Sequence, residues 1–101
     1  MRQNDLARGM FAQLQSIAGI NGLTWITHVE LVVGTKHGVS AEGLADDFEG
    51  AFEGTNFEGA EVEIRIVGPM EEIKSPGRDE MMTTNGWELL ITKLDGRRSN
   101  Q

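Results

Sequence analysis

The feature that most restricts the fold is an alternation of apolar and charged residues between Ala60 and Val67. Ala60, Val62, Ile64 and Ile66 alternate with Glu61, Glu63 and Arg65. A period of two places the apolar side chains on one face of a β-strand and the charged side chains on the other. The chain therefore needs a sheet with one buried and one solvated face, and other elements must cover the buried face.

Two segments have the helical period and supply that cover. The first has the apolar stripe Leu6, Met10, Leu14 and Ile17, with Asn4 or Asp5 as its N-terminal cap. The second follows the N-cap candidate Ser40 and has its apolar positions at Ala41, Leu44, Ala45, Phe48 and Phe52. Both patterns predict amphipathic helices that dock on the sheet.

Two further strands are expected. The stretch 24–33 is rich in β-branched residues and has a more apolar face at Trp25, Val29, Leu31 and Val33, and a last strand follows at 87–94. The segment 68–85, which precedes the last strand, contains both prolines and no sustained hydrophobic period, so it is predicted to be a long loop. The end of the chain from Gly96 onward is expected to fray.

These elements predict one α+β domain over residues 1–101, in the order α-β-α-β-β. The first two strands should be parallel, joined through the second helix, and the last two should pair antiparallel. Both helices would cover a three-stranded mixed sheet in a two-layer α/β sandwich.

Charge and composition exclude several function classes. The 101 residues carry a net charge of -7 and no cysteine, so nucleic acid is not an expected partner and neither a disulfide nor a thiolate metal site can form. No apolar run is long enough for a membrane span or a signal peptide, so a cytoplasmic location is expected.

Eight acidic residues and no Lys or Arg lie between His37 and Ile64. Those on the second helix are candidates for a surface that binds a basic protein partner: Glu42, Asp46, Asp47, Glu49 and Glu53. A solvated helix face that maintains solubility is the simpler interpretation of these residues.

The two histidines are the first candidates for metal or proton chemistry, because only their side chains ordinarily titrate near neutral pH. His28 and Glu30 share one strand face and could supply two metal ligands. An exposed polar strand face is the favoured interpretation, because a metal site needs three or four convergent ligands and the sequence shows no third. His37 lies in a predicted turn, where exposure to solvent is the simpler interpretation. Glu61 and Glu63 share a strand face and could act as an acid/base pair only if burial separated their pKa values.

The order and spacing of residues along the chain resemble the hydrogenase nickel-incorporation proteins of the HypA type. The resemblance rests on Val29, Leu31, Val33 and Gly34; Gly38, Val39, Glu42, Leu44, Phe48 and Glu49; Gly54, Thr55, Glu58, Gly59, Ala60, Val62 and Ile64; and Gly86, Glu88, Leu89, Ile91 and Leu94. Its most specific part is 54–64. It covers nearly the whole chain outside 68–85.

The resemblance implies a nickel metallochaperone with a helix-covered metal-site domain and a separate zinc-binding insertion. In that family two CxxC pairs hold the zinc, so this cysteine-free chain should lack it, and 68–85 stands where the insertion would be. The family's nickel site uses an N-terminal Met-His-Glu, and the matching residues here are Met1, Arg2 and Gln3.

The leading hypothesis is therefore a degenerate HypA-like protein that is not an enzyme and has no cofactor. It would act by contact with a protein partner such as a hydrogenase or a maturation GTPase. One alternative is an altered nickel site that uses the Met1 amine, His28 or His37. Another is a small acid/base enzyme that uses Glu61 or Glu63 together with a histidine.

Overall fold

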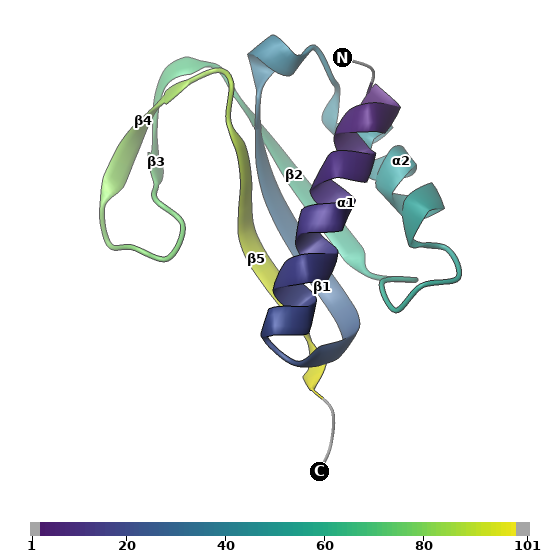
Figure 1. The fold of residues 1–101 in the computed structure, drawn as a ribbon. Coiled ribbons are helices and arrows are strands. Elements are labelled where there is room, and N and C mark those ends of the chain that lie inside the picture. Colours follow the sequence, from purple (N-terminus) through teal and green to yellow (C-terminus); the bar gives the residue numbers. More distant parts are fainter. Residues whose placement is uncertain (1–2, 99–101) are drawn as a thin grey trace.

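A three-stranded sheet with two helices on one of its faces organises the fold (Figure 1). The computed structural model describes residues 3–98. Its elements are α1 (Gln3–Ile20), β1 (Leu23–Gly34), the 3-10 turn η1 (Thr35–His37), α2 (Ala41–Phe52), β2 (Glu61–Val67), β3 (Pro69–Lys74), β4 (Met81–Asn85) and β5 (Leu89–Arg98). The predicted α+β class and two-layer sandwich are confirmed.

Strand β1 is the centre of the sheet, whose order is β2-β1-β5. It runs parallel to β2, as predicted, and antiparallel to β5. The prediction that the last two strands of the sheet pair with each other was wrong. Because β1 contains the consecutive buried residues 31–33, it takes the central position, where both faces of a strand are covered, and β5 joins its free edge.

The main core lies between the helices and the inner face of the sheet. Leu6, Met10 and Leu14 of α1 are buried there as predicted, whereas Ile17 is only half-buried. The rings of Phe11 and Phe52 lie 5.2 Å apart and join α1 to α2. The other buried members of this core are Ala7, Ala18, Ile26, Val29, Leu31, Val33, Leu44, Phe48 and Phe57.

The predicted helix caps have different outcomes. Ser40 does cap α2, since its hydroxyl oxygen accepts a hydrogen bond of 3.0 Å from the Gly43 N–H. The cap predicted for α1 was wrong, because that helix already includes Gln3 and places Asn4 and Asp5 within its first turn.

The inner face of β1 differs from the predicted one at its start. Trp25 is exposed and Ile26 is buried, although Val29, Leu31 and Val33 point inward as expected. The register between β1 and β5 shifts after Ile26, and such an irregularity moves side chains to the opposite face of the strand.

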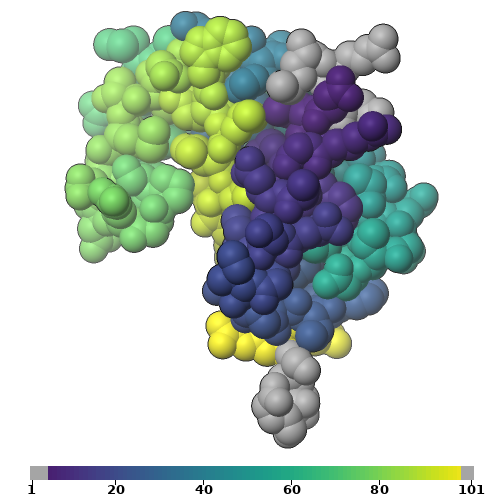
Figure 2. Space-filling view, in the orientation of Figure 1, coloured from purple at the N-terminus to yellow at the C-terminus, as the bar shows by residue number. Residues whose placement is uncertain are grey.

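The segment predicted as a long loop, 68–85, instead contains the antiparallel hairpin of β3 and β4. Its apolar anchor is Ile73, which packs with Val32 and Val67 in a small second core on the outer face of the sheet. Figure 2 shows the hairpin standing to the side of the helix-covered body. Neither short strand buries enough side chains to produce a clear hydrophobic period, which explains why it went undetected.

The last strand is longer than predicted. Strand β5 continues through Arg98, which pairs with Leu23, so the expected fraying from Gly96 is wrong as far as Arg98. The hydroxyl of Thr24 also donates a hydrogen bond to the Arg97 carbonyl. Residues 99–101 lie outside the described part of the chain.

Candidate functional site

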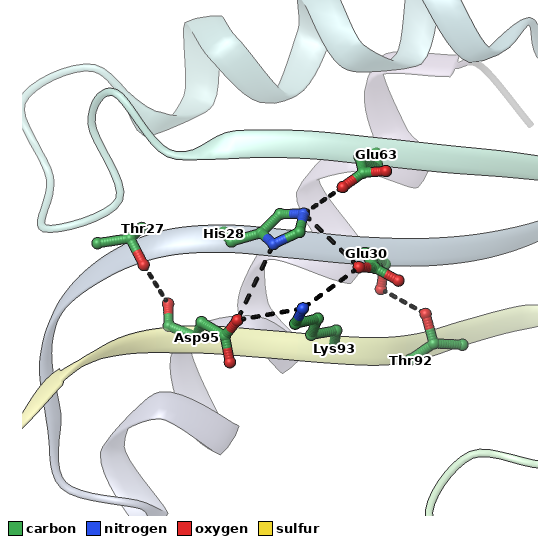
Figure 3. A network of polar contacts seen from close by, with 7 residues as sticks. All are labelled: Thr27, His28, Glu30, Glu63, Thr92, Lys93 and Asp95. Atoms are coloured by element: carbon green, nitrogen blue, oxygen red, sulfur yellow. Dashed lines mark hydrogen bonds and ion pairs between the residues drawn. The ribbon is translucent and has the colours of Figure 1, made fainter.

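Five charged or ionisable side chains meet on the outer face of the sheet (Figure 3). His28 and Glu30 come from β1, Glu63 from β2, and Lys93 and Asp95 from β5. Strand register brings them together, because Glu30 is opposite Glu63 on one side and opposite Lys93 on the other, while His28 is opposite Asp95. We call these five residues the outer-face cluster.

The imidazole of His28 is the centre of the outer-face cluster. Its Nε2 lies 2.5 Å from Oε2 of Glu63 and 3.7 Å from Oε2 of Glu30. On the other side of the ring, Nδ1 lies 3.9 Å from Oδ2 of Asp95. The Lys93 ammonium completes the group at 3.8 Å from Glu30 and 3.5 Å from Asp95.

One ligand atom from each of His28, Glu30 and Glu63 lies within 4.8 Å of the other two. The sequence indicated the first two as neighbours on a strand face, and the structure adds Glu63 as the third. The His28 side chain is 20% exposed and that of Glu63 is 62% exposed, so water can reach this group. Such a trio has the donor types and the access of a surface metal site.

The acid/base pairing proposed for Glu61 and Glu63 is not favoured by this geometry. Glu63 contacts His28, and Glu61 is exposed at the start of β2. Exposure of both carboxylates removes the burial on which that hypothesis depended.

His37 lies away from the outer-face cluster, in η1 beyond the end of β1. Its Nε2 is 3.0 Å from the carbonyl oxygen of Trp87, and the two rings meet edge to face with centroids 5.4 Å apart. The Lys36 ammonium lies 5.8 Å from the centre of the same indole ring. The structure therefore gives His37 a role in holding the turn against 86–88. Met1, the remaining candidate of the altered nickel site, lies outside the described residues.

Glu88 is a buried carboxylate that the sequence marked only as part of the family pattern. It accepts hydrogen bonds from the main-chain N–H groups of Asn85, at 2.7 Å, and Gly86, at 2.9 Å. Burial works to raise the pKa of Glu88, but these N–H groups and the nearby His37 together hold that pKa below its ordinary value. The carboxylate thus fixes the corner where β4 leads into β5.

The acidic residues of α2 form a second candidate site. Their spacing places Glu42, Asp46 and Glu49 along one side of α2, where all three are exposed, whereas Asp47 is half-buried. Glu53 is exposed just beyond the last residue of the helix. Asp46 and Glu49 line a hollow of about 270 Å³ between α2 and β2, whose floor includes Phe52, Ala60 and Val62. Because β2 pairs only with β1 in the described sheet, the hollow borders an open strand edge. We call this hollow the acidic groove.

The architecture places the chain in a known class of fold. No protein-family model matches the sequence, and no curated protein matches it at a significant level. The fold is nevertheless similar to that of a nickel metallochaperone. The solution structure of the Ni metallochaperone HypA from Helicobacter pylori superposes with a TM-score of 0.68 at 15% identity, over 98% of this chain and 100% of that chain. At that identity the likeness shows a shared HypA-like fold.

The described helices also bear on membrane association. Across residues 3–98, no helix combines the length and the apolar character required to cross a membrane.

Proposed function

We propose that the chain is a cytoplasmic, non-enzymatic accessory protein of nickel-enzyme maturation that acts by binding another protein. The observation that carries this proposal is the acidic groove beside an open strand edge, within a fold similar to that of a Ni metallochaperone. The chain has no cysteine, so it would act without the zinc module that the sequence resemblance implies.

The acidic groove favours an extended basic segment as its ligand. The open edge of β2 offers main-chain hydrogen-bonding groups to an added strand, and Asp46 and Glu49 would face cationic side chains of that strand. A hydrogenase or a maturation GTPase that presents a Lys- or Arg-bearing extended segment is the partner we propose. Its binding should weaken as salt is added.

The experiment measures binding of the purified chain to each purified partner by calorimetry at two salt concentrations. The test variant combines Asp46→Asn with Glu49→Gln. The control combines Glu72→Gln with Glu80→Gln, which makes the same change in net charge at exposed hairpin positions.

Exposed ion pairs contribute about 0.7 kcal/mol each, so the groove variant should bind about tenfold more weakly while the hairpin variant keeps its affinity. Equal partner affinities of the parent and both variants would contradict binding of the partner in the acidic groove. Failure of both partners to bind the parent chain would contradict the proposed function.

A further inference from the structure

We propose that His28, Glu30 and Glu63 bind a divalent first-row transition metal ion on the outer face of the sheet. One imidazole nitrogen and two carboxylate oxygens are a donor set that suits ions such as Ni²⁺, Co²⁺ and Zn²⁺ better than Mg²⁺ or Ca²⁺, which prefer oxygen ligands alone. This site uses none of the residues of the acidic groove and lies on the sheet face opposite the helices (Figure 3).

The distances agree with coordination after small side-chain movements. Metal bonds to imidazole nitrogen and carboxylate oxygen are about 2.0–2.2 Å long, which places neighbouring ligand atoms roughly 2.9–3.4 Å apart in tetrahedral or octahedral geometry. The His28 nitrogen is now 2.5 Å from Glu63 and 3.7 Å from Glu30, on either side of that range. Rotation of the two flexible glutamate side chains would bring both into range while the strands stay paired.

The charge of the outer-face cluster also favours a divalent cation. Three carboxylates, those of Glu30, Glu63 and Asp95, face one ammonium group, that of Lys93. With a neutral imidazole, two negative charges remain uncompensated. A divalent ion would neutralise them at a place where the sheet register already holds the carboxylates together.

Asp95 acts in this proposal as a positioning residue. It lies 3.9 Å from Nδ1 of His28, on the side of the ring away from Glu30 and Glu63. A carboxylate there favours the tautomer with hydrogen on Nδ1, so that Nε2 keeps its lone pair for the metal. The neutral ring carries one N–H, so metal binding at Nε2 leaves that hydrogen on Nδ1 beside Asp95, and the Nε2 contact with Glu63 is replaced by a bond from each group to the ion.

The site is open on the side that faces the hairpin. Glu30 and Glu63 border a hollow of about 390 Å³ whose wall includes Ile73 and Lys74 of β3. Water molecules in that space would complete the coordination, because the three side chains fill fewer positions than a four- or six-coordinate ion offers.

The test titrates the untagged full chain with NiCl₂ by calorimetry. The two histidines supply a matched pair of variants, since His28→Gln removes the proposed ligand and His37→Gln removes the other histidine. His28→Gln should weaken Ni²⁺ binding at least tenfold, and His37→Gln should leave it unchanged. Loss of a carboxylate that orients a metal-binding histidine typically weakens metal binding about tenfold or more, so Asp95→Asn should weaken Ni²⁺ binding to a similar extent.

Lys93→Gln separates a metal site from a plain ion-pair network. Removing a cation next to Glu30 should tighten Ni²⁺ binding roughly threefold to tenfold. Mutual ion pairing alone predicts no Ni²⁺ binding in the parent or in this variant. Amide NMR spectra of each variant establish that it is folded, and Ni²⁺ broadening of signals around His28 and Glu63 locates the ion.

The inference is overturned if folded parent protein binds no Ni²⁺ at millimolar concentration. It is also overturned if His28→Gln binds like the parent. Either result leaves the acidic groove and its partner binding intact, because those are measured with different variants and without metal.

Discussion

Glu88 offers the sharpest test of the structure, because its buried carboxylate holds together the corner between β4 and β5. We consider Glu88→Gln, which preserves the shape of the side chain and removes its charge. The carboxylate now accepts hydrogen bonds from the N–H groups of Asn85 and Gly86. Hydrogen bonds to charged groups contribute about 1.5–3 kcal/mol each. The amide oxygen keeps one of these bonds in neutral form, while the new NH₂ group faces the other N–H.

From these contacts we expect Glu88→Gln to lower the free energy of unfolding at pH 7 by about 2–3 kcal/mol. With a urea m value of about 1.5 kcal/mol/M, the unfolding midpoint falls by about 1.3–2 M. The pKa of Glu88 is lower in the folded protein than its ordinary value of 4.5. Its stabilisation is therefore fully present above that ordinary value and is lost as the pH falls through the folded pKa.

The assay is urea unfolding of the parent chain and the variant at pH 7 and at a pH well below 4.5, followed by circular dichroism. The parent should have a much larger free energy of unfolding than the variant at pH 7. The two free energies should approach each other at the low pH, because the glutamate of the parent becomes protonated and the glutamine does not titrate. Glu72→Gln is the control, since Glu72 is exposed and its substitution should change little at either pH. A difference that is the same at both pH values, or below about 0.5 kcal/mol at pH 7, refutes the assignment.

Two further substitutions test how the elements are held. Gly34→Ala would place a Cβ against the main-chain carbonyl of Gly86, so we expect a loss of about 3 kcal/mol in urea unfolding, together with faster amide exchange at Gly34 and Lys36; unchanged exchange there would show that the close approach is wrong. Ser40→Ala removes the cap of α2 and should cost about 1 kcal/mol, and Ser40→Asp, which keeps a capping oxygen, should restore most of it.

The fold was predictable wherever one periodic pattern decided the local structure. The alternation from Ala60 to Val67 predicted β2 and its inner face, and the stripes through Leu14 and Phe48 predicted both helices. Strand pairing was less predictable, because the hydrophobic pattern of a strand does not specify which other strand will pair with it. The hairpin escaped prediction since its one buried apolar side chain, Ile73, depends on a partner core formed by β1 and β2.

The outer-face cluster was also only partly predictable from the sequence. The spacing of His28 and Glu30 was visible in the sequence, and so was the outward direction of Glu63. Their contact needed the parallel register that sets Glu30 opposite Glu63, and the sequence pattern does not define this pairing between segments far apart in the chain. A shift of β2 by two residues would preserve every inward side chain and still move Glu63 away from His28.

The hairpin illustrates how 68–85 is held without the zinc module that the resemblance implies for this place. Its strands depend on specific polar contacts at their base: the Thr84 hydroxyl donates to the Gly68 carbonyl at 2.5 Å and accepts from the Glu71 N–H, whose own carboxylate accepts from the Gly68 N–H. Glu88 continues this set of contacts into β5. A metal site would hold such a segment by a few strong bonds, whereas here a small apolar core and partly buried hydrogen bonds together fix the orientation of the hairpin. Protonation of Glu88 should therefore loosen the hairpin before it disturbs the helix-covered core, because the carboxylate holds the N–H groups of Asn85 and Gly86 at the end of β4.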